Sequence, residues 1–150
     1  MAKTIALIAS LDTKKKETLY AASVIQKQGF STYIIDISTK NLVDGADITP
    51  VEILKRYGIE WEDFDPLGKA ASIDVMSKAA AFVLPQLYAE GKFDVVISIG
   101  GGQNAKMAAM AMKTTAFCCA EDRSIFSGMW KQDHGAVCRR QRYFRYAYSS

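Results

Sequence analysis

Runs of apolar, largely β-branched residues recur at three places along the chain, and longer segments with helical spacing of apolar positions separate them. Each run is five or six residues long, too short for a helix, and nearly continuous in apolar character, as buried parallel strands are. The pattern therefore predicts strands at residues 4–9, 32–37 and 95–99.

The segment after the first predicted strand has the signals of a helix. Ser10 and Asp12 carry short oxygen-bearing side chains that can cap a helix, and Gly29 stands where a helix ends in the left-handed conformation. The spacing predicts one packed face of this helix, made of Tyr20, Ala21, Val24, Ile25 and Gln28. With the strands on either side, this helix predicts a βαβ unit.

Three further helices are predicted downstream. Thr49 and Glu52 form a capping-box pattern with Pro50 at the first helical position, which predicts a short helix. Apolar residues keep helical spacing over residues 70–90, and an alanine- and methionine-rich helix is expected over residues 103–113.

The order of these elements predicts a topology. Right-handed crossovers between parallel strands place the first strand in the middle, so the predicted sheet order is 2-1-3. The fold class is α/β: a Rossmann-like open parallel sheet with helices on both faces, in three α/β/α layers. With three strands it is an incomplete subdomain of that kind.

Two loops are expected to meet at one edge of this sheet. The chain reverses its direction of winding between the first and third strands, and open parallel sheets bind ligands at such a point, beyond the carboxyl ends of the strands. Residues 10–14 follow the first strand and residues 100–104 follow the third. We expect both loops to face a common crevice.

Three consecutive glycines begin the second loop. Gly100, Gly101 and Gly102 allow positive φ and let a ligand approach main-chain N–H groups with no Cβ in the way. The helix that starts at Gln103 points its positive end at the same gap, where phosphate or carboxylate is stabilised. The pattern predicts an anion cradle, although glycines at such a turn also serve tight turns with no ligand.

The first loop and the second strand supply charged candidates. Thr13 and Lys14 could place a hydroxyl and an ammonium on a phosphate, with Asp12 holding a metal ion or the lysine; the alternative is a helix cap followed by a solvated lysine run. Asp36 stands where an acidic residue takes ribose hydroxyls in dinucleotide folds, and a turn or cap residue is the alternative. The P-loop and dinucleotide glycine fingerprints are absent, and no catalytic residue follows from the pattern.

Charge and cysteine content divide the chain. Its formal charge is +3, from 19 Lys and Arg against 16 Asp and Glu; residues 1–113 contain thirteen of each sign, so the whole excess lies later. Cys118, Cys119 and His134 also lie there and fit no common zinc spacing, so no metal site is predicted. With no long apolar run and no signal peptide, we expect a cytoplasmic protein without membrane contact.

Several motifs together resemble a known family. They are Lys3-Thr4-Ile5-Ala6-Leu7-Ile8, Asp12-Thr13-Lys14, Ile34-Ile35-Asp36, Asp47-Ile48-Thr49, Leu87-Tyr88-Ala89-Glu90-Gly91 and Ile97-Ser98-Ile99-Gly100-Gly101-Gly102. With these motifs, residues 3–113 resemble the N-terminal ATP-binding domain of a widespread uncharacterised protein family that includes the plant tobamovirus-resistance protein.

This resemblance implies a cofactor and a place for it. The cofactor would be ATP, with or without Mg²⁺, and its phosphates would lie near residues 12–14 and 100–103. The resemblance also implies a second Rossmann-like subdomain in full-length relatives, which residues 1–150 do not contain. Lys15, Lys16 and Pro85 depart from the family pattern.

The likeness stops after Lys113, and the remaining residues have a separate explanation. Reading the back-translated codons of residues 117–150 one nucleotide later permits a sequence similar to the next strand of the family. We therefore expect residues 1–113 to form a truncated nucleotide-binding subdomain and residues 114–150 to be an aberrant, frameshifted tail. Its basic and aromatic composition is typical of a nucleic-acid-binding segment, but the frameshift would explain it without nucleic acid.

Two functions follow from these observations. The first is binding of ATP, or of a related nucleotide or phosphorylated small molecule, with the reaction unknown and enzyme activity left open. The alternative is a non-enzymatic interaction or regulatory module, which calorimetry with ATP would distinguish. The uncovered edge of the predicted sheet also leads us to expect a homo-oligomer.

Overall fold

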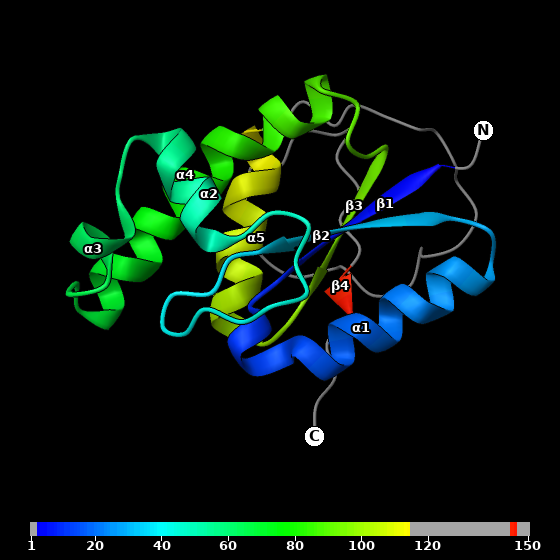
Figure 1. Cartoon of the computed structure of the whole chain (residues 1–150), viewed down its shortest axis with the longest axis horizontal. Coiled ribbons are helices and arrows are strands. Elements are labelled where there is room, and N and C mark those ends of the chain that lie inside the picture. Colours follow the sequence, from blue (N-terminus) through cyan, green and yellow to red (C-terminus); the bar gives the residue numbers. More distant parts are fainter. Residues whose placement is uncertain (1–2, 115–144, 147–150) are drawn as a thin grey trace, which may run out of the picture.

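A parallel sheet with helices on both of its faces forms the centre of the computed structural model, which describes residues 3–114 and 145–146 (Figure 1). The α/β class and the three-strand order 2-1-3 predicted from the sequence are confirmed. The central strand is β1 (Thr4–Ala9), flanked by β2 (Ser31–Asp36) and β3 (Val95–Ile99).

A short fourth strand extends the sheet beyond β3. β4 (Arg145–Tyr146) pairs in parallel with Ser98 and Ile99, so the full order is β2-β1-β3-β4. These two residues belong to the segment that we expected to be an aberrant tail. The sequence pattern predicted a sheet that ends at β3, whereas the sheet in the structure continues to β4.

The register brings the carboxyl ends of the three main strands level. β1 pairs with β2 from Thr4 opposite Ser31 to Ala9 opposite Asp36, and Ala9 also lies opposite Ile99 of β3. The loops that follow these strands consequently leave the sheet at the same edge.

In the described part of the chain, five helices flank the sheet. α1 packs on one face, whereas α2, α4 and α5 lie on the other (Figure 1). Their bounds are α1 (Leu11–Lys27), α2 (Pro50–Tyr57), α3 (Trp61–Phe64), α4 (Lys69–Ala89) and α5 (Gly102–Thr114).

The core has two parts, one on each face of the sheet, and β1 contributes to both. Ala6 and Ile8 point into the larger cluster, and Leu7 and Ala9 point into the smaller one under α1. This alternation follows from the two-residue period of a strand, and it explains why a strand covered on both faces is continuously apolar. The larger cluster includes Ile35, Phe64, Leu84, Leu87 and Phe93.

The predicted core face of α1 is wrong at Tyr20 and Val24, whereas Ile25 of that face packs partly buried against the smaller cluster. Tyr20 is 74% exposed and Val24 is 40% exposed, whereas Leu11, Thr18 and Ala22 are buried. The buried positions are seven and four residues apart, so they also form one stripe along a helix. The small side chains of Thr18 and Ala22 are buried on this stripe, and the larger Tyr20 and Val24 are exposed.

The start of α2 and the ends of α1 and α2 have the capping residues that the sequence predicted. The Thr49 hydroxyl accepts a hydrogen bond from the Glu52 N–H (3.3 Å), and the Glu52 carboxylate accepts one from the Thr49 N–H (2.8 Å), which completes the predicted capping box. α1 and α2 are followed by Gly29 and Gly58 at φ +86° and +92°, conformations that glycine adopts at little cost.

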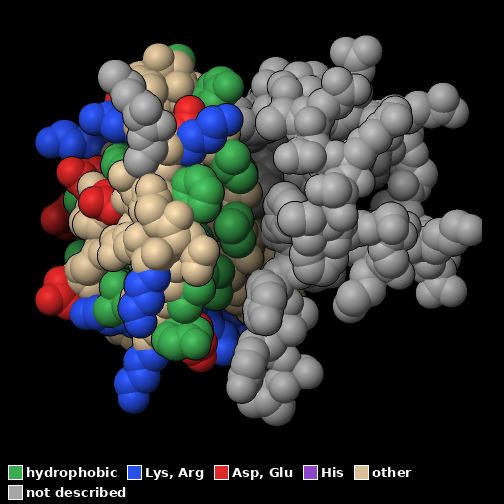
Figure 2. Space-filling model, turned by 90° about the vertical axis from the view of Figure 1, so that its right-hand side faces the viewer, with side chains coloured by type: hydrophobic (Ala, Val, Ile, Leu, Met, Phe, Trp, Pro, Cys, Tyr) green, Lys and Arg blue, Asp and Glu red, His purple; other side chains and the backbone are tan. Residues whose placement is uncertain are grey.

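Charged and apolar side chains are segregated on the face shown in Figure 2. Lys, Arg, Asp and Glu side chains gather toward one margin of the described part, and hydrophobic side chains form a band along the other. Within the described ranges, none of the helices has the length and hydrophobicity of a transmembrane span. A cytoplasmic location remains a prediction.

Burial predicts a contrast between two leucines. Leu87 is fully buried on α4, whereas Leu19 on α1 is 42% exposed. We expect Leu87→Ala to lower the free energy of unfolding by roughly 2–5 kcal/mol, because it leaves a cavity in the core. Leu19→Ala should cost less than about 1 kcal/mol. Urea unfolding of both variants measures this, and equal losses would contradict the assignment of the core face.

Candidate functional site

Two loops lie side by side at the carboxyl edge of the sheet. The Ser10 hydroxyl, directly after β1, donates a hydrogen bond to Asn104 Oδ1 on the first turn of α5 (3.0 Å). The Asn104 amide in turn donates to the main-chain carbonyl of Ile99, the last residue of β3. The side chain of Asn104 therefore joins the first loop, the end of β3 and the start of α5.

Some main-chain N–H groups at the start of α5 have no hydrogen-bond partner among the described residues. The Ala105 N–H donates to the Gly101 carbonyl (2.9 Å) and so closes the first turn of the helix. Gly102 and Gln103 are exposed, and their N–H groups make no hydrogen bond to any other residue in the described ranges. Such free N–H groups at the positive end of a helix are the usual elements of an anion site.

The three glycines have different roles. Gly100 has φ +151°, and a Cβ built there would lie 2.3 Å from the amide nitrogen of Asn104, so this position requires glycine. Gly101 and Gly102 have no such φ, and a Cβ on either would meet no atom within 4 Å. Of the three glycines, which the sequence indicated could all take positive φ, only Gly100 does so. At the other two positions the missing Cβ leaves open space above the main chain.

The start of α1 is capped by residues from another strand. The Leu11 N–H donates to Asp36 Oδ1 (3.1 Å), and the Asp12 N–H donates to the Ser38 hydroxyl oxygen (3.1 Å). The side chain of Ser10, which the sequence predicted as the cap, makes no capping bond. It bonds to Asn104 instead, because Asp36 and Ser38 already satisfy the first two donors of the helix.

The two helix starts therefore differ in what they offer a ligand. In α1 the next two N–H groups, of Thr13 and Lys14, both donate to the Ser10 carbonyl (3.2 and 2.9 Å), so all four initial donors are used. The carboxylate of Asp36 also lies against the positive end of α1. Of the two helix starts at this edge, only that of α5 has main-chain N–H groups with no partner among the described residues.

Asp36 is wholly buried at the end of β2. Its Oδ1 atom accepts hydrogen bonds from Leu11, from the Ser38 N–H (2.9 Å) and from the Ser38 hydroxyl, whereas its Oδ2 atom is buried without a partner in the structure. Burial raises the pKa of this carboxyl, and the hydrogen bonds from Ser38 and Leu11 partly oppose that effect. No ligand can reach the carboxylate in this arrangement of the loop.

The side chains of the first loop make only weak, solvent-exposed interactions with the rest of the chain. The ammonium of Lys14 pairs with Glu17 (3.3 Å), and both groups are well solvated. The backbone at Lys14 departs from helical geometry, with φ −125° and ψ 23°, and its carbonyl accepts a hydrogen bond from the Thr18 hydroxyl (2.8 Å). Thr13 is exposed and Asp12 is partly buried.

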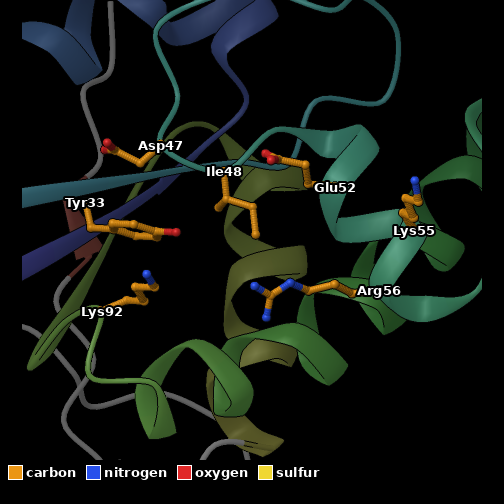
Figure 3. A pocket seen from close by; sticks show the side chains of 7 residues that line it. All are labelled: Tyr33, Asp47, Ile48, Glu52, Lys55, Arg56 and Lys92. Atoms are coloured by element: carbon orange, nitrogen blue, oxygen red, sulfur yellow. The ribbon is translucent and has the colours of Figure 1, made fainter.

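A separate hollow of about 380 Å³ lies on the side of the sheet that carries α2. The hydroxyl of Tyr33 and the cationic groups of Arg56 and Lys92 point toward one space there, while Lys55 points away (Figure 3). Lys92 precedes β3, so the hollow is remote from the glycine loop at the opposite end of that strand. It is lined by Tyr33, Asp47, Ile48, Glu52, Lys55, Arg56 and Lys92.

The charges around this hollow are largely balanced by the chain itself. Arg56 forms an ion pair with Glu90 (2.7 Å), and this pairing, with a smaller contribution from Lys92, lowers the pKa of Glu90. The carboxylates of Asp47 and Glu52 accept hydrogen bonds from main-chain N–H groups. An anion would have to compete with Glu90, so we do not assign a ligand to the hollow.

Sequence reasoning did not single out Ser38, and it placed Asn104 in the second loop without identifying its hydrogen-bond partners. A hydroxyl two residues after Asp36 has a spacing typical of local hydrogen bonds to a carboxylate, and this was the available signal for Ser38. Nothing in the sequence predicts these hydrogen bonds of Asn104, because Ser10 is 94 residues away and Ile99 ends the preceding strand. Cys118, Cys119 and His134 lie outside the described residues.

Comparison with known proteins identifies the family. Residues 3–119 match the Uncharacterised protein family (UPF0261) N-terminal domain. The chain belongs to this family. It is also 28% identical over 116 residues to the "UPF0261 protein" of Clostridium tetani (strain Massachusetts / E88). That alignment covers 75% of this chain and 28% of the relative, so the chain spans little more than a quarter of the relative's length.

The family match bears on the predicted domain boundary. It continues past Lys113, where we expected the likeness to stop, to residue 119. Most of residues 114–150 lie outside the described part of this UPF0261 domain. The frameshift and the division of the chain at residue 113 therefore stay predictions.

The glycine loop of the UPF0261 domain yields a stability test. Gly100→Ala forces a Cβ against Asn104 at an unfavourable φ, so we expect it to lower the free energy of unfolding by roughly 1–3 kcal/mol. Gly101→Ala, which meets open space, should stay within about 0.5 kcal/mol of the parent. Urea denaturation of the two variants makes the comparison, and a Gly101 variant as unstable as the Gly100 one would refute it.

Asp36 yields a pH test. Because its pKa in the folded protein is raised above the ordinary 3.8, the folded state holds this proton more tightly than the unfolded state. Its contribution to stability therefore declines as pH rises from 3.8 through the raised pKa. Asp36→Asn removes that decline, so the stability of the variant minus that of the parent should increase with pH in this window.

Urea unfolding at a series of pH values measures this difference. The other carboxyl groups are common to both proteins and largely cancel in the subtraction. Parallel pH profiles for parent and variant would show that Asp36 has the same pKa in the folded and unfolded states.

Proposed function

We propose that the crevice between residues 12–14 and residues 100–103 binds the phosphates of ATP or of a related phosphorylated ligand. One observation carries the proposal: the hydrogen bond from Ser10 to Asn104 (3.0 Å) fastens the start of α5 beside the first loop. This contact lies where β1 and β3 end, the usual position of ligands in open parallel sheets.

The chemistry of α5 fits a phosphate group. The free N–H groups of Gly102 and Gln103 can donate to phosphate oxygens, and the positive end of the helix favours the added charge. A Cβ on Gly101 or Gly102 would meet no atom within 4 Å, so the main chain of the proposed cradle is open to a ligand. An exposed α5 without this gap would offer the same donors but no room for close approach.

Side chains of the first loop can add to this binding. The ion pair of Lys14 with Glu17 is solvent-exposed, and such pairs contribute about 0–1 kcal/mol, so a phosphate can displace Glu17 at small cost. The hydroxyl of Thr13 and the carboxylate of Asp12 lie on the same loop. Asp12 is the residue that would hold Mg²⁺ arriving with ATP, because hard divalent cations prefer carboxylate oxygen.

Binding rather than a reaction is proposed. The loops offer donors and a cation for phosphate, but no side chain among residues 12–14 and 100–103 is activated as an acid, base or nucleophile. The relative from Clostridium tetani is much longer than this chain, and its remaining length could supply such groups. A regulatory module that binds a nucleotide without converting it to a product is consistent with the same proposed crevice.

Calorimetric titration with ATP and Mg²⁺ tests the proposal on the full chain. Gly101→Val should abolish binding, because its side chain fills the cradle while leaving the main chain unstrained. The matched control is Gly68→Val: Gly68 also precedes a helix, has ordinary φ and faces open space, but it lies at α4. It should bind like the parent, and circular dichroism checks that both variants fold.

Lys14→Ala should weaken ATP binding by roughly 1–3 kcal/mol, the size of a lost charge-assisted hydrogen bond. Its control is Lys16→Ala, because Lys16 is exposed on the same helix without an ion pair to any residue in the described ranges. If folded Gly101→Val binds ATP like Gly68→Val, the glycine loop is only a structural turn. Absence of ATP binding by the parent would favour an interaction module.

A further inference from the structure

The cap on α1 is built from a different element, and this changes what Ser10 can do. In most helices the residue before the first turn uses its own side chain to satisfy the free N–H groups. Here Asp36 and Ser38 perform that task for Leu11 and Asp12. The hydroxyl of Ser10 is thereby released to bond to Asn104 on α5.

These bonds form one continuous path across the edge of the sheet. It runs from Asp36 and Ser38 at the end of β2, through the first residues of α1 and Ser10, to Asn104 and the carbonyl of Ile99 at the end of β3. Asp36 and Ser38 are both fully buried, so they are shielded from competing water. The glycine loop begins at the far end of this path.

We propose that Asp36 and Ser38 are positioning residues that set the geometry of the glycine loop through α1, and that the anion is received by α5 and not by α1. The second part rests on the proposed function. All four initial N–H groups of α1 are already bonded within the chain, and the carboxylate of Asp36 occupies its positive end. A phosphate there would find no donor and would be repelled.

This assignment replaces the predicted ribose contact of Asp36 with an indirect role. A carboxylate that takes ribose hydroxyls must reach the ligand, but Asp36 is 0% exposed and its Oδ1 atom already accepts from three donors. Its effect on a nucleotide should therefore be the same whether or not the sugar carries a 2′-hydroxyl.

The first experiment needs no ligand. Ser38→Ala removes the hydroxyl that joins Asp36 to the Asp12 N–H, and Ser77→Ala is its control, because Ser77 is also a buried serine with a local hydrogen bond on α4. In amide NMR spectra of the full chain, Ser38→Ala should shift the signals of Asp12 and of Gly101 to Gln103. Ser77→Ala should leave these signals in place.

Shifts confined to Asp12, or equal shifts in the Ser77 control, would overturn the coupling to the glycine loop. This NMR experiment tests the positioning role of Asp36 and Ser38 even if the parent protein fails to bind ATP. Such a failure would count against the proposed function alone.

The second experiment compares ATP with 2′-deoxy-ATP by calorimetry. Asp36→Asn and Ser38→Ala should each weaken binding of both nucleotides by roughly two- to tenfold, about the worth of one neutral hydrogen bond, with the ratio of the two affinities unchanged. Ser77→Ala should bind both like the parent. A ratio that changes only in Asp36→Asn would show a direct ribose contact and overturn the positioning role.

Discussion

A carboxylate buried at the end of β2 holds the start of α1, and the arrangement of the carboxyl edge of the sheet depends on that contact. Burying a charged group without compensation is costly, and here Asp36 is compensated by the N–H groups of Leu11 and Ser38, by the Ser38 hydroxyl and by the positive end of α1. Only one of its two oxygen atoms is satisfied, and burial accordingly raises its pKa. The contact defines the path of the chain at the point where β1 becomes α1.

The same contact makes the two helix starts at this edge unequal. α1 is capped and neutralised by its own chain, and α5 keeps free N–H groups above a gap that Gly101 and Gly102 leave open. Ser10 and Asn104 hold the two starts together. This difference between the two helix starts is the reason why the proposed function places the phosphate at α5 and not at α1.

Apolar packing on both faces of the sheet supports this edge without determining its chemistry. β1 sends alternate side chains into two clusters, and α4 and α5 cover the larger one. α1 packs through small and polar residues such as Thr18 and Ala22, which leaves Tyr20 and Val24 outside.

The sequence by itself determined the three main strands, the order 2-1-3, the capping box at Thr49 and the meeting of two loops at one edge, because all of these follow from local periodicity and from the handedness of crossovers. It also identified the glycine loop. Only the tertiary structure decided which stripe of α1 is buried. It also decided that Gly100 is the one glycine of the loop that needs positive φ, and that the buried Asp36 of β2 caps the start of α1. These features depend on contacts such as Leu11 with Asp36 and Ser10 with Asn104, and residues so far apart in the chain leave no local pattern.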